Sequence, residues 1–191
     1  MLNMNETGTA PQPAMQQLIT KLEQVSEWTG RAVAWLTLAM VIAMFAIVIM
    51  RYLFNLNSIA VQESITYMHA IVFMLGAAYT LKHDGHVRVD IFYRRMHKIR
   101  RAWVDLLGTL FLLFPVCLFI LFDSWTYVAK SWQLLEGSSE AGGLPFVYLL
   151  KSTILLLPVL LMAQGLAFAL RNLLVIKHRH VAGSMHEIEE L

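Results

Sequence analysis

Four apolar stretches separated by polar segments dominate this chain of 191 residues: residues 32–50, 64–81, 106–122 and 152–170. None of them contains Asp, Glu, Lys or Arg. As helices with a rise of 1.5 Å per residue they would reach about 26 to 30 Å, which matches a bilayer core of about 30 Å. Alternation typical of barrel strands is absent, and a lipid-exposed helix satisfies its own backbone hydrogen bonds. The pattern predicts an all-α membrane protein with four transmembrane helices.

The flanking residues extend the predicted spans and define the ends of the domain. We expect spans at about residues 30–54, 61–82, 103–133 and 146–173. They lie within a single membrane domain of residues 14–176, between a disordered N-terminal tail (1–13) and a C-terminal tail (177–191). Helical spacing of apolar residues also predicts amphipathic interfacial helices before the first and third spans. Their apolar stripes are Met15, Leu18, Leu22 and Val25, broadened by Ile19, and Phe92, Met96, Ile99 and Trp103.

Charge determines the expected orientation. The composition, 58% hydrophobic and only 15% charged, supports a membrane protein, because soluble domains usually carry about 25% charged residues. Four spans would place twelve of the 15 Lys and Arg residues on the side that holds both termini and the central loop. The opposite side has Arg51, Lys130 and Lys151. Because basic loops remain in the cytoplasm, we expect both termini to be cytoplasmic.

The central loop, residues 81–101, concentrates seven of these basic residues. We interpret it as a topology anchor that rests on anionic lipid headgroups, and we do not expect nucleic-acid binding. Aromatic rings favour the headgroup level, so tryptophans near the span ends are also expected anchors. The predicted anchoring residues are Arg94, Arg95, Lys98, Arg101, Trp103, Trp125 and Trp132.

Residues with catalytic or ligand chemistry are sparse. His83, His86 and Asp90 have spacings of three and four, but Gly85 interrupts a helix there and no fourth ligand is evident, so we expect no metal site. His69 lies inside the second span, where we expect a neutral imidazole hydrogen-bonded to a neighbouring helix. Hydrolase, Walker A and zinc-protease motifs are absent from the sequence, so we expect neither an enzyme nor a bound cofactor.

Several motifs together resemble one family. RYLFN at 51–55 is followed by Glu63, LGAAYTL at 75–81 ends the second span, and GHVRVD occupies 85–90. The second half contributes EGSSEAGGLPFVYLLKS at 136–152. In combination these segments are similar to the small membrane subunit (DctQ-like, Q-type) of TRAP transporters, the tripartite ATP-independent periplasmic transporters. Many members carry a tryptophan and two adjacent carboxylates before the second span, whereas this chain has Glu63 alone.

The resemblance implies a scaffold subunit in a bacterial inner membrane. In such systems a periplasmic binding protein delivers an organic acid, usually a carboxylate or sulfonate. A large multi-span (M-type) subunit then moves it inward by a sodium-driven elevator motion, and the small subunit braces that larger partner. Matching the family motifs residue by residue gives candidate partner-interface positions at Glu63, His86, Arg88, Asp90, Gly143, Pro145 and Lys151.

Two other functions fit four spans. A haem-bearing membrane anchor of a respiratory redox complex would need two axial histidines at membrane depth, and the sequence offers His69. A small self-sufficient transporter working as an oligomer around Glu63 is the other. The charge asymmetry disfavours insertion in both orientations, which some such oligomers use.

Overall fold

The structure is a computed structural model that describes residues 13–86, 93 and 95–189. All regular elements among these residues are helical. They are α1 (Pro13–Leu53), α2 (Ile59–Lys82), α4 (Lys98–Gly108), the π-helical turn η1 (Thr109–Leu113), α5 (Phe114–Gln133) and α6 (Val147–Glu189). In this described part of the chain, four continuous helical segments are long and apolar enough to cross a membrane: Ala14–Leu53, Ile59–Lys82, Lys98–Gln133 and Val147–Lys177. The prediction of an all-α protein with four apolar helices is therefore confirmed, while its orientation in a bilayer stays a prediction.

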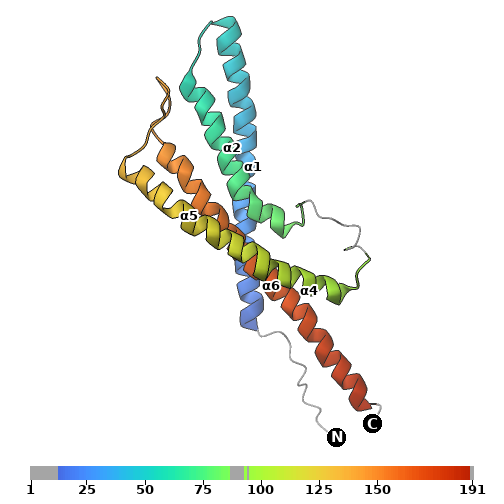
Figure 1. Cartoon of the computed structure of the whole chain (residues 1–191). Coiled ribbons are helices and arrows are strands. Elements are labelled where there is room, and N and C mark those ends of the chain that lie inside the picture. Colours follow the sequence, from blue (N-terminus) through green and yellow to red (C-terminus); the bar gives the residue numbers. More distant parts are fainter. Residues whose placement is uncertain (1–12, 87–92, 94, 190–191) are drawn as a thin grey trace.

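The helices form two hairpins that cross each other (Figure 1). Helices α1 and α2 make one hairpin, and α5 and α6 make the other. Helix α6 lies at the centre of the packing, because it contacts α1, α2, α4 and α5. The connections 54–58 and 134–146 lie together at the upper end in Figure 1, here named the hairpin end. The opposite end, where α2 finishes at Lys82 and α4 begins at Lys98, is named the loop end.

Two helices end in the same hydrogen-bonded cap. After α2, Asp84 adopts a φ of 52°, and the N–H of Gly85 donates to the carbonyl oxygen of Thr80 at 2.9 Å. After α5, Leu135 adopts a φ of 45°, and the N–H of Glu136 donates to the carbonyl oxygen of Ser131 at 3.1 Å. These are Schellman caps built on residues other than glycine.

The third membrane segment is continuous from Lys98 to Gln133 through the π-helical turn. The turn ends two residues before Pro115, whose missing N–H and bulky ring disturb regular α-helical bonding. Gly165 of α6 packs here, since a Cβ on it would lie 2.6 Å from Leu113 Cδ2. The expected amphipathic helix before this span is α4, which begins at Lys98, so Met96 lies outside it. Phe92 lies outside the described residues.

The N-terminal amphipathic helix differs from the expectation. Helix α1 runs without a break from Pro13 to Leu53, so residues 14–25 extend the first span instead of forming a separate surface helix. The predicted stripe is buried only in part: Ile19 is buried, whereas Leu18 and Val25 are exposed, and the polar Ser26 and Thr29 complete the buried face. Ser26 explains the difference, because its polar contact with α6 turns this face inward.

Candidate functional site

The candidate interface residues fall at the two ends of the bundle. Glu63, Gly143, Pro145 and Lys151 lie at the hairpin end, and His86 lies exposed just beyond α2 at the loop end. Arg88, Asp90 and the anchoring residue Arg94 lie outside the described residues, so their predicted roles have no structural description. A role for any of these residues in binding another chain stays a prediction.

Glu63 fastens the loop between α5 and α6 onto α2. The backbone N–H of Leu144 donates to Oε2 of Glu63 at 2.6 Å. The hydroxyl of Ser138 donates to Oε1 of the same carboxylate. One side chain in the second turn of α2 thus holds the 134–146 connection at two points, Ser138 and Leu144.

Two glycines make that contact sterically feasible. A Cβ at Gly143 would lie 2.4 Å from Ser138 Oγ and 2.7 Å from Glu63 Oε1, distances shorter than any real contact. Gly142 adopts a φ of 82°, in the left-handed region that side chains disfavour. The Gly-Gly pair is therefore required by the way the loop meets Glu63.

Lys151 is held by groups of its own chain. Its Nζ lies 2.6 Å from Oε2 of Glu136 and 4.1 Å from the centre of the Tyr127 ring. The Lys151 side chain is only 15% exposed. Its hydrogen bond lowers the pKa of Glu136 below the ordinary carboxyl value. The lysine therefore stabilises the junction of α5 and α6, while Pro145, in the connection before α6, is exposed.

The predicted tryptophan anchors are exposed on the helix surface. Trp125 and Trp132 lie toward the hairpin end of α5, and Trp103 lies in α4 at the loop end. The Trp132 indole N–H donates to Ser152 Oγ at 2.8 Å, so its polar edge has a partner. Arg95 and Lys98 are exposed, whereas Arg101 donates to the Met96 carbonyl oxygen at 2.9 Å. Exposed tryptophans at both ends of the bundle are compatible with two membrane–water interfaces. Their contact with lipid stays a prediction.

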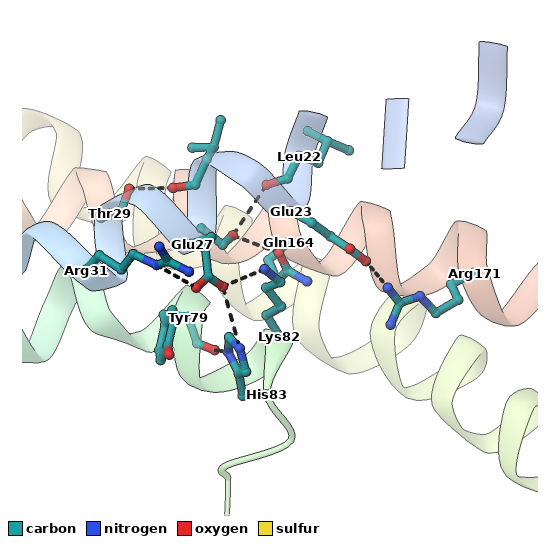
Figure 2. Close-up of polar contacts among 12 residues, drawn as sticks. Leu22, Glu23, Glu27, Thr29, Arg31, Tyr79, Lys82, His83, Gln164 and Arg171 are labelled. Carbon is teal, nitrogen blue, oxygen red and sulfur yellow. Dashed lines mark hydrogen bonds and ion pairs between the residues drawn. The ribbon is translucent and has the colours of Figure 1, made fainter. Parts of the chain in front are cut away.

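A second polar cluster, at the loop end, was missed by sequence reasoning. Figure 2 shows the Glu27 carboxylate between Arg31 Nε at 3.0 Å and Lys82 Nζ at 2.6 Å, with His83 Nε2 at 3.5 Å. The tight packing beside it depends on Gly30, where a Cβ would lie 2.2 Å from the Tyr79 ring. The signal in the sequence was the spacing of four between Glu27 and Arg31. Lys82, counted as a topology residue, also joins α2 to α1.

Two further contacts of this cluster tie α1 to α6 (Figure 2). Ser26 donates to Gln164 Oε1 at 2.7 Å, and these side chains are 1% and 2% exposed. One turn earlier, Glu23 pairs with Arg171. The loop end is therefore joined across three helices by polar contacts, as the hairpin end is joined through Glu63 and Lys151.

His69 does not behave as expected. Its side chain is exposed on the outward face of α2 and its ring stacks with Phe73, with centroids 6.5 Å apart. Within the part of the chain that the structure describes, the expected hydrogen bond to a neighbouring helix is not formed. Among the described residues there is also no group of three or more His, Cys, Asp or Glu side chains placed to hold a metal.

Comparison with known proteins gives one family. Residues 23–175 match the family model described as the DctQ component of tripartite ATP-independent periplasmic transporters. The chain is 33% identical over 90 residues to the C4-dicarboxylate TRAP transporter small permease protein DctQ of Vibrio cholerae, covering 47% of this chain and 38% of that relative. The match thus spans well under half of the curated relative. No solved structure matches the chain significantly.

Proposed function

Because the chain belongs to the DctQ family, the non-catalytic small permease components of tripartite ATP-independent periplasmic transporters, we propose that it braces the large permease subunit of such a transporter. That subunit moves the substrate by an elevator motion coupled to sodium, and a periplasmic binding protein delivers the substrate. The name of the Vibrio cholerae relative supports a small organic acid of the C4-dicarboxylate type as a candidate substrate.

The observation that carries the proposal is the cross-linking of the bundle at both ends. At the hairpin end, Glu63 of α2 holds the α5–α6 connection. At the loop end, Lys82 of α2 and Gln164 of α6 both contact α1. A brace must keep its shape while its partner moves, and discrete polar contacts between all the long helices oppose sliding and splaying.

The proposed orientation places the loop end in the cytoplasm and the hairpin end in the periplasm. Twelve basic residues would then lie inside and three outside, as the positive-inside rule favours. In this orientation the GHVRVD segment, with His86, Arg88 and Asp90, would meet the cytoplasmic edge of the large subunit. The exposed Pro145, next to the Gly143 and Lys151 region, would be available on the periplasmic side.

Affinity purification tests this proposal. The chain carries a tag and is co-expressed with the large permease subunit from the same organism. We expect the two to co-purify in mild detergent as a stable complex, and the tagged chain alone to be inserted but inactive in uptake. Purification of the chain without that partner, from cells that express both, would contradict the brace.

A further inference from the structure

The outward face of α2 differs from the other outward faces of the bundle. It is formed by Gln62, Thr66, His69 and Phe73, all exposed. Their spacings of four, three and four residues bring them within about 60° of one another around a helix. This set is named the α2 polar face. It lies on the opposite side from the interior of the bundle, where α2 packs against α1 and α6.

The depth of His69 makes this face costly in lipid. His69 is about 15 Å along the helix from Ile59, close to the middle of a hydrocarbon layer of about 30 Å. Hydrocarbon offers no hydrogen-bonding group, so a polar side chain at that depth is normally turned toward protein. Here it is turned away from its own chain. Gln62 is satisfied at the helix start, donating to Asn57 Oδ1 at 2.7 Å, which leaves Thr66 and His69 as the groups to be matched.

The outward faces of the neighbouring helices are suited to lipid. On α5 the exposed side chains include Phe119, which is 69% exposed, and Phe122; on α1 they include Val41, Ile42 and Phe45. These named side chains are apolar, and the exposed Thr37 of α1 donates its hydroxyl to the carbonyl oxygen of Ala34 in its own helix at 2.6 Å. Of the four candidate spans, α2 also has the lowest mean hydropathy. The chain thus presents hydrocarbon-compatible surfaces on two helices and a hydrogen-bonding surface on a third.

We propose that a transmembrane helix of the large permease subunit packs on the α2 polar face and places a hydrogen-bonding side chain opposite His69. This rests on the proposed function and names the surface through which the brace is attached within the membrane. A neutral imidazole has one donor and one acceptor, so a partner amide, hydroxyl or carboxyl group completes it. In a two-fold pair of identical chains whose His69 rings met on the axis, the two rings would need opposite tautomers, so a helix of a different chain is the better occupant.

Photo-crosslinking in the assembled transporter tests the assignment. A benzophenone amino acid replaces His69, or Phe119 as the matched control on α5, in the complex held in lipid nanodiscs. We expect the label at position 69 to form a covalent product with the large subunit, and the label at position 119 to give lipid adducts. The proposal would be overturned if the label at position 69 reacted with lipid or cross-linked two copies of this chain. Equal capture of the large subunit from positions 69 and 119 would also overturn it.

Substitution gives a second measurement that does not depend on the label. We expect His69→Leu to weaken co-purification of the large subunit by roughly threefold to fifteenfold, the range for one hydrogen bond between membrane helices. We expect His69→Asn to restore most of the binding, because an amide also donates and accepts. Equal binding by the Leu and Asn variants would refute the hydrogen bond. If the unaltered chain fails to bind the large subunit, both this proposal and the brace fail; if it binds but His69 captures lipid, only this proposal fails.

Discussion

Oε2 of Glu63 lies 2.6 Å from the backbone nitrogen of Leu144, although 81 positions separate the two residues in the sequence. With the second hydrogen bond from Ser138, this carboxylate sets the position of the whole connection between α5 and α6. Its effect is to join the two hairpins at the end where they would otherwise splay apart (Figure 1). Glu63 also belongs to the family motif in the sequence.

Replacing Glu63 by Ala should free the 134–146 connection while leaving the helices intact. Both hydrogen bonds to the carboxylate are lost, so we expect roughly threefold faster proteolytic cleavage within this connection. Limited proteolysis of the purified protein, read by mass spectrometry, measures the rate. Glu140→Ala, which changes an exposed carboxylate in the same loop, is the control. Equal cleavage of the two variants would show that Glu63 does not hold the loop.

The contact between Gly30 and Tyr79 should be sensitive to a single methyl group. Because a Cβ at Gly30 would lie 2.2 Å from the Tyr79 ring, we expect Gly30→Ala to lower the free energy of unfolding by about 1 to 3 kcal/mol. Gly108 is the matched control, since a Cβ there has no described neighbour within 4 Å. Thermal unfolding in detergent compares the two, with Gly108→Ala unchanged or slightly stabilised. A similar loss of unfolding free energy in both variants would mean that Gly30 does not pack closely against Tyr79.

We expect the Ser26–Gln164 hydrogen bond to stabilise the folded protein, because both side chains are buried. Ser26→Ala leaves the Gln164 amide unpaired, and we expect a loss of about 1 to 3 kcal/mol in unfolding free energy. Combining it with Gln164→Leu removes the unpaired amide and should recover part of the loss. A double-mutant cycle on unfolding free energies measures the coupling. Additive effects of the two substitutions would be inconsistent with a direct bond.

The GHVRVD motif carries the proposed cytoplasmic contact with the large subunit. We expect replacement of Arg88 and Asp90 by Ala to reduce co-purification of that subunit severalfold without preventing membrane insertion. Their charges would contribute to recognition by a partner and are not needed to hold the spans in lipid. Arg100→Ala, at an exposed position in α4, controls for general loss of positive charge. Full partner binding and uptake by the Arg88 and Asp90 variants would remove the motif from the interface.

The long apolar runs predicted the helices well because length and lack of charge decide whether a segment can cross lipid. The caps were harder to predict, since Asp84 and Leu135 adopt left-handed backbone where glycine is the usual signal. The prediction of a separate N-terminal helix was wrong because the sequence pattern does not mark where a helix ends. Amphipathic spacing shows that a helix has two faces, and it does not show whether the helix ends before the next apolar run.

Contacts between distant segments explain what sequence reasoning missed in the candidate site. Glu27 and Lys82 are 55 positions apart, and their pairing depends on how α1 and α2 pack. The Schellman cap after α5 places Glu136 beside Lys151, a contact that the sequence did not indicate, and the expected contact of Lys151 with a partner stays a prediction. His69 was expected to bond inside the chain because polar groups avoid lipid, and it points outward. The physical rule still applies if the hydrogen-bonding group lies in another subunit.

Reconstituted uptake tests the central claim most directly. Liposomes would contain this chain alone, the large subunit alone, or both, with the binding protein, radiolabelled dicarboxylate and an inward sodium gradient supplied outside. The brace account predicts uptake with both subunits and none with this chain alone, even at the highest protein density. Sodium-driven uptake by this chain alone would contradict the account.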